Sequence, residues 1–179
     1  MPVLVPFVAG NLKKGVLMKN LFKWAFVLMF LSGTGYAQQT DSIARPVAFN
    51  TADVKWVPAP QLGNGAEMAV LAGNPKESGA FTVRLRFPAN YDIKPHRHPG
   101  IEHVTVIEGV LYAGTGSEFS RDKATLVLKP GGFVAIPPET PHFGYTRGVL
   151  ILQINGTGPF DIIYINKEDD PRGSGQKGP

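Results

Sequence analysis

The chain contains no cysteine, which excludes disulfide bonds, thiolate metal ligands, a cysteine nucleophile and a lipid-modified N-terminal cysteine. It has only four histidines among 179 residues, so a histidine cluster must use most of them. No acidic residue precedes residue 38. From residue 38 onward, no stretch shows the 3.6-residue apolar period of an amphipathic helix, which argues against a helical fold.

The formal charge of +4 comes entirely from the first 37 residues. These residues carry four lysines and no other charged side chain, which leaves 18 − 4 = 14 basic and 14 acidic residues in 38–179. The body of the chain is therefore neutral. This balance removes the main support for nucleic-acid binding, and we predict no nucleic-acid partner.

The first 37 residues have the layout of a secretory signal peptide. Met18–Lys23 is a short positive region, Trp24–Leu31 is apolar, and small residues precede a cut predicted between Ala37 and Gln38. Translation starting at Met18 is an alternative. The apolar run is shorter than the ~20 residues of a membrane span, so we predict export with no stable membrane anchor. An uncleaved N-terminal anchor is the competing interpretation.

The rest of the chain is typical of an all-β protein. Phe81, Val83, Leu85 and Phe87 alternate with polar residues, which is the period of a half-buried strand. Further short strands separated by Gly/Pro turns are predicted at 66–72, 101–109, 124–128, 133–136, 148–154 and 161–165. This pattern predicts an antiparallel sandwich or barrel over 54–166, after a flexible segment at 38–53 and before a disordered tail at 167–179.

Three of the histidines and one glutamate form a candidate metal site. His96, His98 and Glu102 share one parity along a strand, so they point to the same face. Val104 and Val106 continue that face, as expected for a barrel interior. His142 follows a Pro-rich turn on another strand and is placed to close the site. His103 has the opposite parity, so we predict that it is not a ligand.

These residues occur in two motifs that resemble those of the cupin superfamily. The first motif is Gly, five residues, His-x-His, three or four residues, Glu, six residues and Gly; the matching positions here are Asn90, His96, His98, Glu102 and Gly109. Asn replaces the first Gly. Asn tolerates a left-handed backbone, so we expect the turn to survive.

The second motif follows about 40 residues after the first. It is Gly, five residues, Pro-x-Gly, two residues, His, three residues and Asn, matched by Gly131, Pro137, Glu139, His142 and Thr146. Glu139 replaces the Gly of the turn and Thr146 replaces the final Asn. The resemblance covers about residues 80–155 and keeps all four ligand positions. A cupin barrel that has lost its metal is the structural alternative.

The resemblance implies a double-stranded β-helix, or jelly-roll barrel, that holds one divalent ion at His96, His98, Glu102 and His142. Three nitrogens and one carboxylate fit Fe(II), Mn, Ni or Zn and leave two positions open. Gln153 and Tyr145 are candidates for contacts just outside the ligands. The resemblance also implies a homodimer, with residues 54–60 as a strand to exchange, and a bacterial periplasmic address.

Two classes of function follow from the resemblance. The first is a metal-dependent enzyme, most simply a dioxygenase acting on a small oxygen-rich molecule; an isomerase or lyase without redox chemistry is a variant. The second is a non-catalytic module that binds a metal or a small ligand, such as a sensor or a sugar-binding cupin. The fold does not decide between them.

Overall fold

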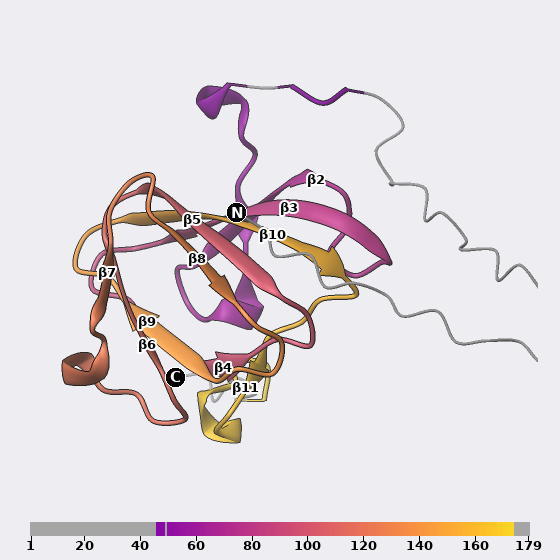
Figure 1. The fold of residues 1–179 in the computed structure, drawn as a ribbon. Helices are drawn as coiled ribbons and strands as arrows, with labels where there is room; N and C mark the ends of the chain where they lie inside the picture. Colours follow the sequence, from indigo (N-terminus) through magenta and orange to yellow (C-terminus); the bar gives the residue numbers. More distant parts are fainter. Residues whose placement is uncertain (1–45, 49, 174–179) are drawn as a thin grey trace, which may run out of the picture. The chain divides into compact units, whose positions relative to one another are not determined.

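The computed structural model describes residues 46–48 and 50–173 (Figure 1). The predicted signal peptide therefore lies outside the described residues, as do the predicted cut and most of the predicted flexible segment. Within the described part, eleven β-strands and four short 3-10 helices follow one another, and no α-helix is present. The predicted all-β class is confirmed.

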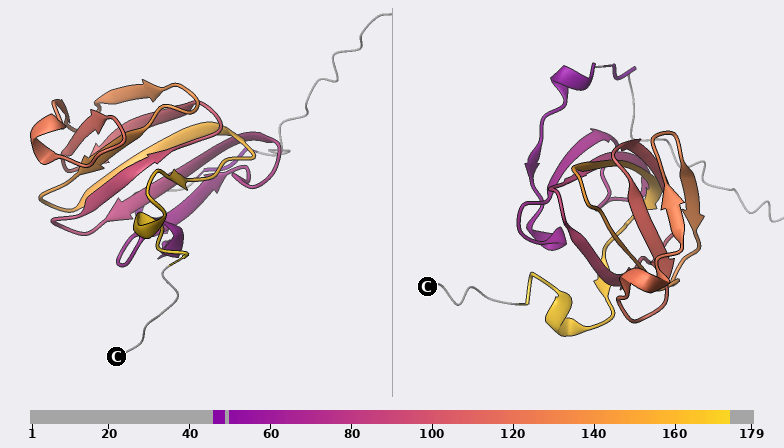
Figure 2. Two further views of the ribbon diagram at one scale, coloured as in Figure 1. Left: turned by 90° about the horizontal axis from the view of Figure 1, so that it is seen from below. Right: turned by 90° about the vertical axis from the view of Figure 1, so that its left-hand side faces the viewer.

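The strands form two antiparallel sheets that face each other (Figure 2). The larger sheet has the order β1-β2-β3-β10-β5-β8. Its strands are β1 (Val57–Pro58), β2 (Glu67–Ala72), β3 (Gly79–Phe87), β5 (Glu102–Glu108), β8 (Phe133–Ile136) and β10 (Leu150–Gly158). The smaller sheet has the order β11-β4-β9-β6-β7. Its strands are β4 (Asp92–Arg97), β6 (Leu111–Thr115), β7 (Leu126–Leu128), β9 (His142–Tyr145) and β11 (Ile163–Tyr164).

The 3-10 helices connect or flank the strands. They are η1 (Thr51–Asp53), η2 (Pro60–Leu62), η3 (Arg121–Lys123) and η4 (Lys167–Asp169). In the described part of the chain, no helix has the length and apolar character needed to cross a membrane.

The core lies between the sheets and is built by alternating residues of three adjacent strands. β3 contributes Phe81, Val83 and Phe87, and the paired strands add five further side chains, namely Val104, Val106, Leu150, Leu152 and Ile154. Complete burial of one such side chain stabilises the fold by roughly 1.5–3 kcal/mol. The predicted inward face of Val104 and Val106 is confirmed, since their exposed fractions are 4% and 1%.

Two predicted boundaries differ from the structure. β10 continues through Gly156 to Gly158, where a turn was predicted. Residues 167–173 were predicted to belong to a disordered tail, but they form η4 and the hydrogen bonds of Arg172 to Asp161, Ile162 and Asp170. Charge composition suggested a solvated tail, whereas specific ion pairs order this part of it. The remaining tail residues, 174–179, lie outside the described residues.

The proposed exchange strand is paired within its own chain. Val57 and Pro58 of β1 pair with Met68 and Glu67 of β2 at the edge of the larger sheet. The homodimer stays a prediction.

Candidate metal centre

Strands of both sheets bring the four predicted ligands together. His96 lies in β4 and His142 begins β9, and these two residues are register partners in the smaller sheet. Glu102 begins β5 of the larger sheet, and His98 lies just past the end of β4. All four are buried, with exposed fractions of 5–8%. The site therefore lies between the two sheets.

Each histidine is held by a hydrogen bond from Nδ1 to a backbone carbonyl. His96 Nδ1 is 2.7 Å from Lys94 O, His98 Nδ1 is 2.7 Å from Asp161 O, and His142 Nδ1 is 2.9 Å from Thr140 O. A carbonyl only accepts, so in a neutral ring Nδ1 carries the proton and Nε2 keeps its lone pair. This tautomer is the one that binds a metal through Nε2 while its second nitrogen is anchored.

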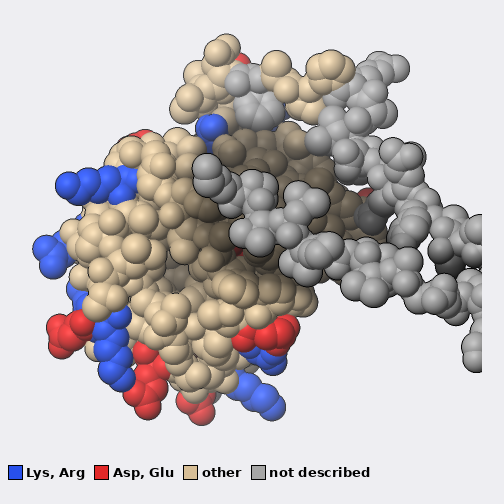
Figure 3. All heavy atoms as spheres, in the orientation of Figure 1, with Lys and Arg blue, Asp and Glu red and all other residues tan. Residues whose placement is uncertain are grey.

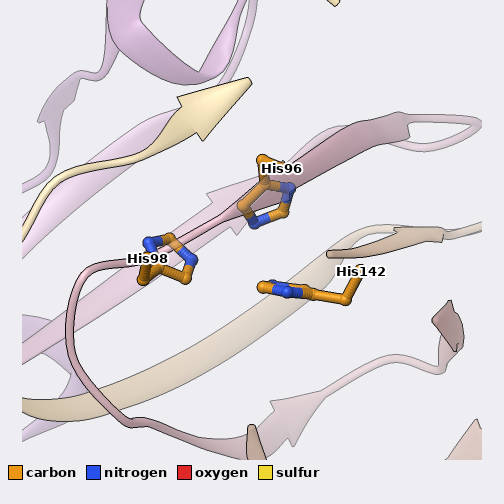
Figure 4. Close-up of side chains that lie close together, drawn as sticks. All are labelled: His96, His98 and His142. Carbon is orange, nitrogen blue, oxygen red and sulfur yellow. The ribbon is translucent and has the colours of Figure 1, made fainter. Parts of the chain in front are cut away.

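The three imidazoles point toward one another (Figure 4). One ring nitrogen from each lies within 4.8 Å of the others. For comparison, two nitrogens bound on opposite sides of one ion would be about 4.2 Å apart, which is close to the limit of 4.8 Å found for the three rings. Glu102 completes the group, with Oε1 3.5 Å from His98 Nε2 and Oε2 3.4 Å from His142 Nε2.

One buried nitrogen shows that this group lacks a partner. His98 Nε2 is buried and has no hydrogen-bond partner among the described residues. A buried polar atom without a hydrogen-bond partner destabilises the folded state by about 1–3 kcal/mol, so we expect a binding partner for this nitrogen. An ion bound at Nε2 would supply the missing interaction, and the donor set of nitrogen and oxygen fits a divalent transition metal.

Burial sets the charges of the site in favour of an ion. It lowers the pKa of His96 to about 3, with further lowering by the nearby His142 and His98. It also lowers the pKa of His98. Burial, the largest influence, opposes ionisation of Glu102, but the combined effect of the three neighbouring histidines outweighs it, and the pKa of Glu102 falls below its ordinary value. At neutral pH His96 and His98 are then neutral and Glu102 is a carboxylate, so these three groups need no proton removed before binding.

Two adjoining cavities reach the site. The inner cavity has about 80 Å³ and is lined by the four candidate ligands and apolar side chains of the core. The outer cavity has about 740 Å³. Its walls include Met68, Phe81 and Phe160, and its charged members are Lys76, Glu102, Asp161 and Arg172. Because His98 and Glu102 line both cavities, a molecule in the outer cavity meets the ligands directly.

Departures from the motifs preserve the local backbone. Asn90 has φ 59°, the left-handed conformation expected there. Glu139 has φ 58°, so it also adopts a conformation that glycine would take without strain. Its amide donates to His98 O at 2.8 Å, and its carboxylate pairs with Arg97. Thr146 is buried and donates its hydroxyl to Gly148 O at 2.8 Å.

Two predicted candidates lie away from the ligands. Gln153 alternates with the buried Leu152 and Ile154, so it is on the opposite side of β10, where Arg84 Nε donates to it at 3.3 Å. Tyr145 is buried in a separate aromatic cluster, stacked on Tyr112 with ring centroids 4.6 Å apart. Neither lines the cavities at the site. The structure therefore places neither residue at these cavities. Gln153 was chosen as a polar residue in an apolar strand without regard to its parity, and Tyr145 was chosen for its nearness to His142 in the sequence.

The fourth histidine, His103, lies apart from the three histidines of the candidate site. His103 is stacked on Phe133 with ring centroids 5.8 Å apart and is not among the described residues grouped as a possible metal site. One site contact had no signal in the sequence, namely Asp161. It acts through its backbone carbonyl, which any residue can supply. Phe160, stacked on His98 with ring centroids 4.4 Å apart, was also missed.

Comparisons with known proteins agree with this architecture. Residues 44–143 match the family model described as the ChrR cupin-like domain. No curated protein sequence matches the chain significantly.

Several solved structures share the fold. An RmlC-like cupin from Shewanella frigidimarina has 18% identity and a TM-score of 0.50, over 64% of this chain and 91% of that one. The polyketide cyclase RemF from Streptomyces resistomycificus has 19% identity and a TM-score of 0.55, covering 71% and 90%. An RmlC-like cupin from Ralstonia eutropha has 17% identity and a TM-score of 0.52, covering 73% and 82%. At these identities the likeness shows the RmlC-like jelly-roll fold alone.

Proposed function

The chain belongs to the family of ChrR cupin-like domains, and on this premise we propose that it is a metal-dependent enzyme acting on a small molecule. One divalent ion would be held by His96, His98, His142 and Glu102. The observation that carries the proposal is the buried, unpaired Nε2 of His98 inside a group of convergent donors. The metal is Fe(II), Mn, Ni or Zn, because the donor set suits each of them.

The chemistry follows from four ligands that leave two positions of a six-coordinate ion open. When bound, the ion would supply Lewis acidity and, as Fe(II), dioxygen activation. Glu102 neutralises one of its two charges, and the apolar walls of the inner cavity keep bulk water away. We infer a dioxygenase-like reaction on a small oxygen-rich molecule, such as a β-dicarbonyl or phenolic compound.

The outer cavity supports an enzyme over a metal-storing module. Its apolar walls adjoin the ligands, and a volume of about 740 Å³ lies within the range of small-molecule pockets. A substrate would direct its oxygen atoms toward His98 and Glu102 and place its apolar part against Phe160.

The metal proposal is tested by metal content. We expect one divalent ion per chain in the wild type, and loss of most of it in His98→Ala and in His142→Ala, because each removes a ligand. His103→Ala is the matched control, since this histidine lies outside the site, and should keep the wild-type content. Stoichiometric metal that persists in both ligand variants would refute the site.

Catalysis is tested separately from binding. The metal-free protein is loaded with Fe(II) under anaerobic conditions, and oxygen uptake is followed after adding diketones or catechols. We expect uptake that depends on His98 with at least one compound. Intact metal with no uptake across the panel would instead favour ligand binding, or an isomerase or lyase reaction monitored by product analysis.

We further propose that the protein is exported to a bacterial periplasm. The support is the lysine-bearing segment Met18–Lys23, the apolar run Trp24–Leu31 and the small residues before Gln38. Mass spectrometry of the protein from fractionated cells should find the N-terminus at Gln38 in the periplasmic fraction. An intact leader in a membrane fraction would favour the uncleaved anchor.

A further inference from the structure

His98 is held differently from the other two histidines. The Nδ1 acceptors of His96 and His142 are carbonyls only two residues earlier in the chain. The acceptor of His98 is the carbonyl of Asp161, which is 63 residues later. The orientation of His98 therefore depends on how firmly the segment after β10 is fixed, whereas the ring of His96 is held by its own strand and that of His142 by the turn directly before β9.

Arg172 binds this segment through both terminal nitrogens of its guanidinium, and its remaining hydrogen bonds go to Asp170. Its Nη1 donates to both carboxylate oxygens of Asp161, at 3.0 and 3.3 Å. Its Nη2 donates to Ile162 O at 2.8 Å and to Asp170 Oδ2 at 2.9 Å, and its Nε donates to Asp170 Oδ1 at 2.9 Å. Arg172 thus holds the peptide that carries the Asp161 carbonyl at two points, which are the carboxylate of Asp161 and the carbonyl of Ile162.

The same segment also surrounds His98 and walls the outer cavity. Phe160 stacks on the His98 ring at an interplanar angle of 16°, and its amide donates to Pro75 O at 2.7 Å. Ile162 is 6% exposed and lines both cavities. Arg172 itself lines the outer cavity. Loss of the Arg172 contacts would loosen the Asp161–Ile162 part of this segment, while the Phe160 amide and the pairing of β11 with β4 would still hold its ends.

We propose that Arg172 is a positioning residue for the metal centre, which acts through the Asp161 carbonyl to fix the ring and tautomer of His98. This inference rests on the proposed metal function, but it also concerns the metal-free protein. Removing partners that orient a histidine ligand typically weakens metal binding 10- to 100-fold. Because Arg172 acts through one intermediate peptide, we expect a loss near tenfold.

The first measurement follows the Nδ1 protons of the three histidines by NMR in the metal-free protein. In Arg172→Ala, solvent exchange of the His98 proton should accelerate at least several-fold, and those of His96 and His142 should stay unchanged. Arg172→Lys keeps a positive charge but cannot form the paired fork, so it should lie between the two.

The second measurement is affinity for Zn²⁺ by competition with a chelator. Arg172→Ala should bind about tenfold more weakly, and Arg172→Lys less weakly than that. The matched control is Arg121→Ala, because Arg121 also pairs with a carboxylate, Asp92 at 2.9 Å, but lines neither cavity at the site. It should keep wild-type exchange and affinity.

The outcomes separate this inference from the metal proposal. Unchanged His98 exchange in Arg172→Ala would overturn it, as would equal acceleration at all three histidines, which would show a general loss of structure. If Arg172→Ala does not fold, Asp161→Asn replaces it, since that variant keeps the carbonyl and weakens the clamp. If the wild type binds no Zn²⁺, the metal proposal fails, while the exchange data still test the clamp.

Discussion

At the scale of single residues, burial keeps His96 and His98 neutral and makes the stability of the metal-free protein sensitive to acid. His96 is almost fully buried beside His98 and His142, and these surroundings lower its pKa to about 3 from an ordinary value of 6.5. A protonated imidazole there would lack water and face other donors. The folded protein therefore keeps this ring neutral across most of the acidic range.

The stability of the metal-free protein should fall as the pH falls from about 6.5 toward 3. In that window the unfolded chain binds a proton at His96 and the folded chain does not, so protonation favours unfolding. The expected slope is about 1.4 kcal/mol per pH unit for one such group. Glu102, whose pKa is also lowered, adds to the loss below about 4.5. Urea unfolding at several pH values measures it.

One variant serves as the control for this slope. His96→Gln removes the group and should reduce the slope by about one proton. His98, whose pKa is also lowered, keeps part of the slope in this variant. A stability that is flat between pH 6.5 and 4, or a slope that is not reduced in His96→Gln, would contradict the burial argument.

The ligands could be predicted from the sequence because their chemistry is carried by side chains at a fixed spacing. The period of two places His96 and His98 on one side of the chain, but Glu102, predicted on the same strand face, begins β5 of the other sheet, so it was found through the spacing of the cupin motif. The anchors of the rings could not be predicted in this way, because a carbonyl such as that of Asp161 exists at every residue. Gln153 shows the converse error. A polar residue in an apolar strand suggested a role at the site, but its hydrogen bond with Arg84 accounts for the polar side chain.

At the scale of elements, strands with alternating residues were predictable, while strands built around glycine were not. β9 has all four residues buried and contains Gly144, where a Cβ would lie 3.0 Å from both Leu111 Cδ1 and Tyr112 O. Gly156 was assigned to a turn, yet it lies within β10. Glycine is required there because a Cβ would come 2.8 Å from Phe81 Cζ. In both strands glycine provides space for a neighbour.

The turn before β9 offers a prediction about backbone strain. Glu139 has φ 58°, a conformation that costs a non-glycine residue about 1 kcal/mol or more. Glu139→Gly should therefore raise the free energy of unfolding by about 0.5–1 kcal/mol, since the partly exposed ion pair with Arg97 contributes little. Urea unfolding of the metal-free protein measures the change.

Glu139→Ala separates strain from the lost ion pair. It removes the carboxylate but keeps the strained conformation, so its stability should equal or fall below that of the wild type. If the glycine and alanine variants are equally stable, the left-handed turn stores no strain.

At the scale of the whole molecule, the balanced charge of residues 38–179 and the two-sheet barrel determine which charges and surfaces a partner would meet. On the face in Figure 3, basic and acidic side chains intermingle along the left and lower rim. This distribution suits an uncharged or small ligand better than a polyanion, in agreement with 14 basic and 14 acidic residues after residue 37. The four candidate metal ligands are not on this surface, because they are buried between the sheets.

The position of the ligands predicts that a bound ion links the two sheets. Glu102 belongs to the larger sheet, whereas His96 and His142 belong to the smaller one. At a concentration 100 times its Kd, an ion stabilises the folded state by about 2.7 kcal/mol. For a domain of this size, that corresponds to a rise in Tm of roughly 10 °C. Thermal unfolding with Zn²⁺ and with a chelator measures the shift.

Two spectroscopic signals test whether the link acts on both sheets. Trp56, over which Arg86 of the larger sheet lies at 4.6 Å, reports on that sheet by fluorescence. The stacked Tyr112 and Tyr145 report on the smaller one by near-ultraviolet circular dichroism. Zn²⁺ should raise both transitions together by the same amount, and His142→Ala should abolish the rise in both. A rise confined to one signal would place the ion within one sheet, and a rise that survives in His142→Ala would place it elsewhere.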